Sequence, residues 1–259
     1  RDGTVTGVQT CALPISALGE RPRLQKLMLA GNRLQSLPGS LRQCQSLELL
    51  RIAANQLEAL PGWLADLPRL AWLAIGGNAF NDAAEAQARS AQDADGIGWA
   101  RLACGELLGE GASGRIYAGV LDPGAAAQAV AVKLFKGQVT SDGWPLTEMA
   151  ASLAAGRHPR LIPVLGRLDG HPDGAQGLVM ERIAPDYRTL AGPPSFETCT
   201  RDVYPAGLHL GAGVALRIAA DVGSALAHLH SRGLVHGDLY AHNLLWWADA
   251  PPGAAAGLL

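Results

Sequence analysis

The chain has 259 residues, 48% of them hydrophobic and 17% charged, so it can bury a sizeable core and is long enough for about two domains. Its formal net charge of −2, from 21 basic and 23 acidic residues, leaves no basic surface for nucleic acid and no polybasic patch for a membrane. The 4 cysteines lack Cys-x-x-Cys spacing, which indicates a reduced, cytoplasmic chain without a zinc site. We expect no membrane span, because the longest apolar stretch, 212–229, carries charged residues at helical spacing.

The first segment, residues 1–16 (RDGTVTGVQTCALPIS), matches no pattern found later in the chain. It resembles translated sequencing-adaptor read-through, and the other interpretation is a natural, poorly ordered tail. We therefore expect it to contribute neither to the fold nor to the function.

A repeat with a period of 23 residues runs from Leu24 to about Phe80. Each unit contains a Leu-x-Leu or Leu-x-Ile pair, which predicts a short strand, and an Asn, which predicts a turn where its amide bonds to backbone groups. The aligned positions are Leu24, Leu47 and Leu70; Leu27, Leu50 and Leu73; Leu29, Ile52 and Ile75; and Asn32, Asn55 and Asn78. This pattern resembles that of leucine-rich repeats and implies a short solenoid over residues 17–81.

Partner binding on the concave face of the sheet is what the repeat resemblance implies. The strand positions expected to face outward there are Met28, Arg51, Trp72 and Ala74, and they would contact an unknown protein ligand. The other interpretation is a structural spacer. Solenoids need about three or more repeats and a cap, so we expect further repeats before Leu24 in the intact protein. Residues 82–98, small, polar and Ala-rich, predict a cap or linker.

A Gly-x-Gly-x-x-Gly sequence occupies residues 109–114. Dinucleotide-binding folds use the same letters, but there the third glycine opens a helix. Here apolar residues alternate from Ile116 to Val120, which predicts a strand and therefore a hairpin. A second strand, Val130-Ala131-Val132-Lys133, follows and ends in a lysine. By itself such a lysine is usually a solvated edge charge.

Helical and strand patterns continue after the lysine. Glu148 lies beside Met149 and Leu153, which predict the apolar face of a helix, and its other interpretation is a carboxylate on the helix surface. Residues 177–183 (GLVMERI) predict a strand and the start of a connection. Residues 216–230 show helical spacing, and Gly233 stands at a typical helix stop.

Residues 236–243 read HGDLYAHN, with Asp238 and Asn243 five positions apart. Taken in order with the glycine sequence, Lys133 and Glu148, this segment resembles the H-R-D-L-x-x-x-x-N catalytic loop of protein kinases. The resemblance covers residues 99–259. It implies a two-lobed α+β domain, with small lobe 99–180, hinge 181–185 and an incomplete large lobe 186–259, so the whole chain is of mixed α/β class.

The kinase resemblance also implies ATP and Mg²⁺ as cofactors and a protein as substrate. Asp238, Lys133 and Glu148 would be the catalytic residues: Asp238 would take the hydroxyl proton, and Lys133, paired with Glu148, would contact phosphates. Asn243 would be the metal ligand. The nucleotide would lie against residues of the small lobe and hinge: Gly109, Gly111, Ser113, Gly114, Ala131, Lys133, Met180, Glu181 and Ile183.

The sequence departs from the kinase pattern at three places. Gly237 replaces the arginine that pairs with a phosphorylated activation loop in many kinases, and Tyr240 replaces a lysine common in serine/threonine kinases. No Asp-Phe-Gly occurs, so we expect a cut-off kinase that is inactive by itself. The alternative is a pseudokinase or nucleotide-binding scaffold that acts through the repeats. A repeat-only interaction protein conflicts with the four ordered motifs.

Overall fold

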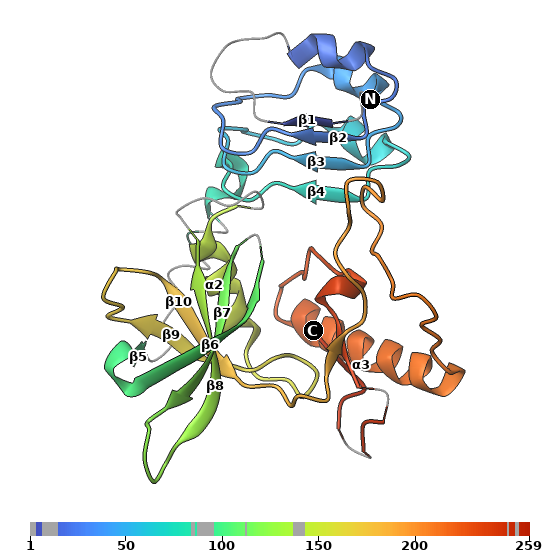
Figure 1. The fold of residues 1–259 in the computed structure, drawn as a ribbon. Helices are drawn as coiled ribbons and strands as arrows, with labels where there is room; N and C mark the ends of the chain where they lie inside the picture. The colour runs from blue at the N-terminus through green and yellow to red at the C-terminus, as the bar shows by residue number, and fades with distance from the viewer. Residues whose placement is uncertain are drawn as a thin grey trace. The chain divides into compact units, whose positions relative to one another are not determined.

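The protein is described here in a computed structural model, which covers residues 4–6, 15–83, 86, 96–111, 113–136, 143–247, 249–251 and 254–259 (Figure 1). The chain forms two compact units. The first contains residues 1–91 and 136–148, and the second contains residues 92–135 and 149–259.

The first unit is a parallel sheet of short strands in the order β1 (Thr4–Thr6), β2 (Lys26–Met28), β3 (Leu49–Arg51) and β4 (Trp72–Ala74). Figure 1 shows these strands stacked one above another. Leu27 pairs in register with Leu50, and Leu50 with Leu73, so neighbouring strands are one sequence repeat apart. Short 3-10 helices complete the turns: η1 (Ile15–Glu20), η2 (Gly39–Gln43), η3 (Gly62–Asp66) and η4 (Ala79–Asn81).

The repeated asparagines hold neighbouring repeats together. The side-chain amide of Asn55 donates to the carbonyls of Leu29 (2.9 Å) and Ile52 (3.0 Å), and its Oδ1 accepts from the N–H of Leu34 (3.0 Å). Asn78, which is fully buried, forms the equivalent bonds in the next repeat, with Leu57, Ile52 and Ile75. The predicted role of the Asn positions is therefore confirmed. The leucines and isoleucines between them form one core cluster: Leu24, Leu27, Leu29, Leu41, Leu47, Leu50, Ile52 and Leu57.

The outward strand positions follow the prediction only in part. Arg51 lies with its guanidinium carbon 5.0 Å from the Trp72 ring centroid, so these two side chains share a face. Ala74 pairs in register with Arg51 and is buried (7% exposed), so its contact with a partner on this face stays a prediction. Leu73, expected in the core, is 36% exposed. β4 is the edge strand of the described sheet, so no further repeat covers Leu73, whereas the small Ala74 pairs with the long Arg51.

The N-terminal segment also differs from the expected tail, because Thr4–Thr6 pair with β2. Without β1, the hydrogen-bonding groups of β2 would form an open sheet edge. Thr-Val-Thr is β-branched throughout and therefore suits a strand.

Residues 143–148, remote in sequence, belong to the first unit as well. A Cβ added to Gly143 would lie 3.2 Å from the Cα of Gly76, and one added to Gly77 would collide with the Trp144 ring. Both glycines have positive φ, +132° and +72°. The positive φ angles and the close contacts, with the Trp144 side chain at Gly77 and with the Gly76 backbone at Gly143, therefore favour glycine at both positions.

The second unit has a six-stranded sheet in the order β5-β9-β10-β8-β7-β6. The strands are β5 (Gly96–Gly98), β6 (Leu102–Glu110), β7 (Gly114–Leu121), β8 (Gln128–Phe135), β9 (Val164–Asp169) and β10 (Gly177–Glu181), and only the β5–β9 pair is parallel. The predicted linker 82–98 thus ends in a strand. Its Ile97 is buried in a core cluster with Val130, Val132, Leu168 and Val179.

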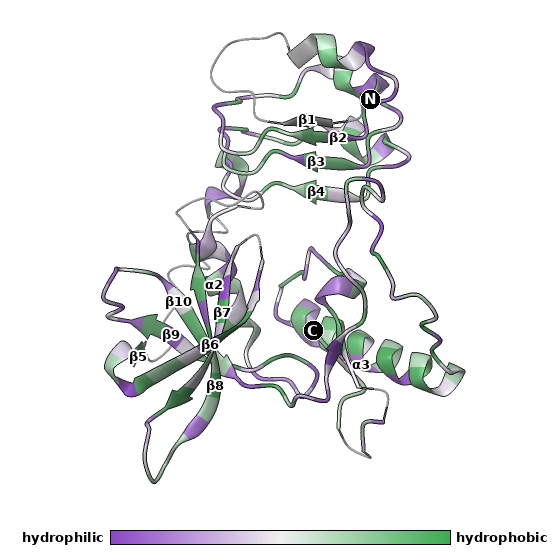
Figure 2. Cartoon of the chain, viewed as in Figure 1, coloured by the Kyte–Doolittle hydropathy of each residue, from purple (hydrophilic) through white to green (hydrophobic). Residues whose placement is uncertain are grey.

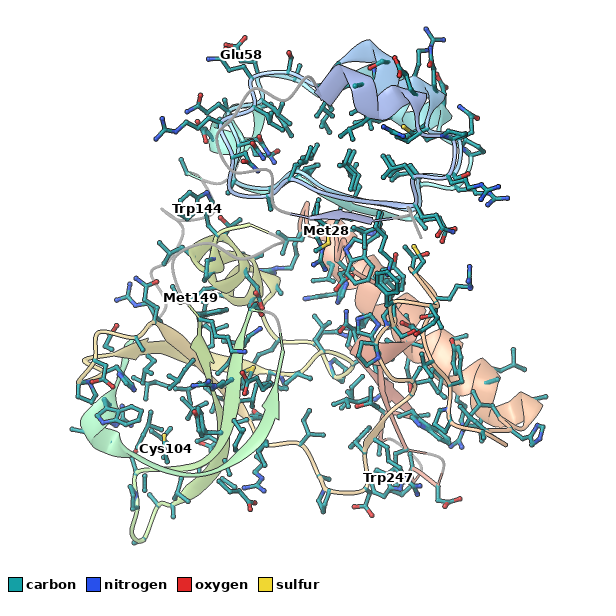
Figure 3. The ribbon with its side chains drawn as sticks, turned by 45° about the horizontal axis from the view of Figure 1, so that its top comes forward. Met28, Glu58, Cys104, Trp144, Met149 and Trp247 are labelled. Atoms are coloured by element: carbon teal, nitrogen blue, oxygen red, sulfur yellow. The ribbon has the colours of Figure 1, made fainter. Side chains whose placement is uncertain are left out.

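Two longer helices, α2 and α3, lie among the described residues. α2 (Pro145–Ala155) begins at a proline, which suits the first helical turn, and its Met149 (labelled in Figure 3) is only 2% exposed. α3 (Ala212–Ser231) ends before Gly233, whose φ of +72° is typical of a helix stop. A three-stranded sheet, β11 (Arg188–Thr189), β12 (Leu245–Trp246) and β13 (Gly257–Leu258), follows the order β11-β12-β13.

Within the described residues, α3 is the one helix whose length and hydropathy would allow it to cross a membrane, and Figure 2 shows its apolar character. Some core helices of globular domains have the same length and hydropathy, and 17% of the apolar window of α3 is buried. Ile218, Ala225 and Leu229 are buried, and Asp221 accepts hydrogen bonds from the backbone N–H groups of Ala256 (2.6 Å) and Gly257 (3.2 Å). These are contacts of a helix packed within the second unit.

Candidate active site

The glycine sequence forms the turn of the β6–β7 hairpin. The N–H of Gly111 donates to the carbonyl of Gly114 over 2.9 Å and closes the turn. A Cβ added to Gly109 or Gly111 would meet no atom within 4 Å. No described atom therefore fills the space beside these two Cα atoms, and their contact with phosphate stays a prediction.

Gly114 has a different role from the first two glycines. A Cβ at this position would lie 2.6 Å from the carbonyl oxygen of Leu134 and 3.3 Å from the Cε of Lys133. The glycine thus allows β7 to pass directly beside the Lys133 stem on β8. Lys133 pairs in register with Ile116 on β7 and Leu178 on β10, which places it inside the sheet. Its Nζ lies 5.1 Å from the Phe135 ring centroid.

Glu148 lies in the first turn of α2, so the predicted helix is confirmed. Glu148 belongs to the first unit and Lys133 to the second. Their ion pair therefore stays a prediction.

The residues expected to surround the adenine come from neighbouring strands. Ala131 on β8 pairs with Met180 on β10 and with Ala118 on β7, and Ala131 is buried. Glu181 is the last residue of β10, and its N–H donates to the carbonyl of Pro163 over 2.9 Å. After the strand, Ile183 is half-buried, and its backbone N–H and C=O form no hydrogen bond with another described residue. A backbone N–H and C=O without partners among the described residues can form hydrogen bonds with a nucleobase.

Asp238 and Asn243 meet in the catalytic loop. The Asn243 side-chain amide donates to Oδ2 of Asp238 (2.7 Å) and to its carbonyl oxygen (2.9 Å). Oδ1 of Asp238 is buried and has no hydrogen-bond donor among the described residues. A buried carboxylate oxygen without a donor is costly in a folded protein and marks a position where a hydroxyl proton would be stabilised.

The residues beside Asp238 shape the loop. Gly237 has φ of +75°, so the residue that replaces arginine also supplies a left-handed turn. Nδ1 of His236 accepts the N–H of Asp238 over 3.3 Å, so this histidine helps to hold the backbone of the loop. Burial lowers the pKa of His236, and the nearby Asp238 carboxylate opposes that shift. A neutral His236 is therefore favoured, and it is the form that can accept this bond.

Asp202 is a residue that the sequence reasoning missed. Its Oδ2 accepts the backbone N–H groups of Ala241 (2.6 Å) and His242 (3.3 Å), and its Oδ1 lies 2.6 Å from Nδ1 of His242. It lies about 40 residues before the loop in the sequence and belongs to no recognisable motif, so no pattern could have revealed it.

Tyr240 packs against His242 in a stacked arrangement with ring centroids 5.5 Å apart. Burial, and then the Asp238 and Asp202 carboxylates, raise the pKa of the Tyr240 hydroxyl. The Tyr240 hydroxyl therefore stays protonated and neutral, and a tyrosine supplies no positive charge where many kinases have a lysine.

An amide oxygen such as Oδ1 of Asn243 suits Mg²⁺ better than a metal that prefers sulfur or nitrogen ligands. Asn243 uses its amide nitrogen toward Asp238, and its Oδ1 accepts no hydrogen bond from the described residues. No group of three or more His, Cys, Asp or Glu side chains that could hold a metal occurs in the part of the chain that the structure describes. Mg²⁺ needs few protein ligands, because it keeps waters and binds phosphate oxygens. Asn243 thus fits as a single protein ligand.

Family comparisons agree with both parts of the chain. A family described as "Leucine rich repeat" matches residues 22–80, and a family described as "Protein tyrosine and serine/threonine kinase" matches residues 102–250. The chain belongs to the protein tyrosine and serine/threonine kinase family. The kinase match contains the glycine hairpin, Lys133, Asp202 and the catalytic loop.

A curated relative from Oryza sativa subsp. japonica, "CBL-interacting protein kinase 22", is 31% identical over 150 residues. The match covers 56% of this chain and 33% of the relative. The chain therefore spans about a third of that kinase's length. Membership of the kinase family implies use of ATP and Mg²⁺ in general.

Proposed function

We propose that this protein is an ATP-dependent protein kinase that transfers a phosphoryl group to a protein hydroxyl and uses its leucine-rich repeats to recognise a partner. The observation that carries the proposal is the pair Asp238–Asn243. Asn243 holds one carboxylate oxygen at 2.7 Å, while the other, Oδ1, is buried without a donor among the described residues. A hydroxyl placed there would donate to Oδ1 and be oriented for attack.

The roles of the other residues follow from their positions. The open backbone at Gly109 and Gly111 would face phosphates, and Lys133, beside Gly114, would contribute its positive charge. Glu148 would hold Lys133 by an ion pair. Ala131, Met180 and the backbone of Glu181 and Ile183 would contact adenine. The magnesium ion, when bound, neutralises phosphate charge, and Asn243 Oδ1 would be its ligand.

The arrangement of the whole chain is part of the proposal. We infer a short solenoid from the parallel strands one repeat apart, and a two-lobed domain from the six-stranded sheet and from α3 with the catalytic loop. The solenoid face with Met28, Arg51 and Trp72 would bind a protein, since arginine and tryptophan are frequent at protein interfaces. The absence of Cys-x-x-Cys pairs supports a cytoplasmic location.

Radiolabelled phosphate transfer by the complete protein tests the activity. We expect transfer by the wild type, no detectable transfer by Asp238→Asn or Lys133→Met, and unchanged transfer by Asp173→Asn, an exposed carboxylate in the β9–β10 turn. All variants should unfold at the same denaturant concentration within error. Wild-type rates in Asp238→Asn would refute the proposed base.

A second function is favoured by two residues. Gly237 and Tyr240 leave the loop without the positive charges that many kinases have there, and Tyr240 is held neutral. A pseudokinase or nucleotide-binding scaffold would bind ATP but transfer no phosphate. Fluorescent ATP analogue binding that is lost in Lys133→Met, together with no transfer by the complete wild type, would select this function.

A further inference from the structure

One buried carboxylate holds the backbone of the catalytic loop. Oδ2 of Asp202 accepts two successive N–H groups, those of Ala241 and His242, and Oδ1 accepts the Nδ1–H of His242. The Asp202 side chain is only 6% exposed. A carboxylate accepts but does not donate, so His242 must carry its proton on Nδ1.

The bonds of Asp202 end at the start of the 3-10 helix η6 (Ala241–Asn243). The residue before this helix, Tyr240, forms no side-chain cap of its own. Asp202 therefore supplies the cap from a distant segment, and charge-assisted bonds to backbone N–H groups are among the stronger hydrogen bonds of proteins. The two capped N–H groups belong to the first two residues of the turn that ends at Asn243.

Asn243 links the capped turn to the proposed base. Its N–H donates to the carbonyl of Tyr240 (3.0 Å), and its side-chain amide donates to Asp238. Asp202 is thus connected to Oδ2 of Asp238 through the Tyr240–Ala241 peptide group, whose N–H donates to Asp202 and whose carbonyl accepts the N–H of Asn243, and then through the Asn243 side chain. A turn that loosened at Ala241 would release the bond that orients Asp238.

The segment that carries Asp202 is itself anchored to the loop. Val203 and Gly192 exchange two backbone hydrogen bonds (2.8 and 3.0 Å). Next to Gly192, Leu190 donates to the carbonyl of Leu244, and Thr189 pairs with Leu245 on β12. The carboxylate is therefore presented from a backbone that is tied to the chain just after Asn243, which preorganises it.

We propose that Asp202 is a positioning residue for phosphoryl transfer, whose carboxylate holds η6 so that Asn243 can orient Asp238. This inference rests on the proposed kinase activity for its kinetic consequence and on the hydrogen bonds alone for its structural consequence. In this role Asp202 acts through its bonds to Ala241 and His242 and not through contact with substrate or nucleotide. Its loss affects the turnover number and leaves nucleotide affinity unchanged.

The structural test is amide hydrogen exchange, followed by NMR, in the 259-residue chain. In Asp202→Ala we expect exchange at the N–H groups of Ala241 and His242 to rise at least about tenfold, and the Asn243 side-chain amide signals to shift. Asp202→Asn keeps an acceptor oxygen for the two N–H groups, and its amide can bond to the other tautomer of His242. This variant should therefore stay close to wild type.

The kinetic test uses the complete protein. Asp202→Ala should lower kcat about 10- to 100-fold with KM for ATP within about twofold, Asp202→Asn should recover most of the loss, and Asp173→Asn should match wild type. A wild type without transfer would refute the proposed function, and the exchange experiment would still decide the role of Asp202. Exchange and kcat both unchanged in Asp202→Ala would overturn the inference.

Discussion

Arg160 and Asp221 form an ion pair, with Nε of Arg160 2.6 Å from Oδ1 of Asp221 and both side chains largely buried. The second oxygen of Asp221 accepts the backbone N–H groups of Ala256 and Gly257 at β13. One side chain of α3 thus joins the segment after α2 to the last described strand.

Replacement of Asp221 should destabilise the second unit. Asp221→Ala leaves a partly buried guanidinium and two backbone N–H groups without their partner, which should cost about 2–4 kcal/mol of unfolding free energy. Asp221→Asn retains one acceptor and should cost less. Urea unfolding followed by circular dichroism measures both variants, with Asp173→Asn as control, and equal midpoints for all three would contradict the prediction.

The asparagine positions of the repeat should differ in their contribution. Asn55→Ala removes bonds to Leu29, Leu34 and Ile52 inside the repeat core and should lower stability by ~2–4 kcal/mol. Asn32→Ala should cost less than about 1 kcal/mol, because the carbonyl of Leu29 keeps its bond from Asn55. Chemical unfolding of the two variants side by side is the measurement. A larger effect at Asn32 would refute this account.

Alanine substitutions at two glycines of the β6–β7 hairpin should have different effects, one on stability and the other on nucleotide binding. Gly114→Ala would place a methyl group 2.6 Å from the Leu134 carbonyl oxygen, so it should lower the melting temperature by several degrees. Gly111→Ala meets no atom within 4 Å and should melt like wild type, yet bind an ATP analogue more weakly. Thermal unfolding with and without nucleotide distinguishes the two effects. Equal melting of the two variants would be evidence against the close strand approach at Gly114.

Stability should depend on pH through His158. Its ring is stacked on His228 with centroids 4.8 Å apart, and burial, then the charges of His228 and Arg160, lower its pKa from the ordinary value of 6.5. The unfolded chain therefore binds a proton more readily, so stability should fall as pH drops through about 6.5 and level off below the folded pKa. Urea midpoints measured from pH 7.5 to 5.5 should fall more for wild type than for His158→Gln. Parallel pH curves would exclude this histidine as the source.

Local patterns predicted much of this protein because they depend on near neighbours. The Leu-x-Leu pairs predicted β2 and β3 and the core role of Leu27 and Leu50, since strand side chains alternate whatever surrounds them. Alternation after Gly114 predicted β7. The five-residue spacing of Asp238 and Asn243 placed both in one loop, where a 2.7 Å bond joins them, and their joint role in catalysis stays a prediction. Each of these relations spans only a few residues or repeats at a fixed interval.

Tertiary structure decided the relations that no interval encodes. Leu73 is exposed because β4 ends the described sheet, although its equivalents in the earlier repeats, Leu27 and Leu50, are the same residue and are buried. Ile97 lies in the six-stranded sheet because its strand, β5, pairs with the edge of β9. Asp202 lies beside the loop that it caps because its neighbour Val203 pairs with Gly192 by backbone hydrogen bonds, although Asp202 is about 40 residues from that loop in the sequence. Sequence spacing determines which residues share a strand or a turn, whereas the folding of distant segments onto one another determines which carboxylate holds the loop.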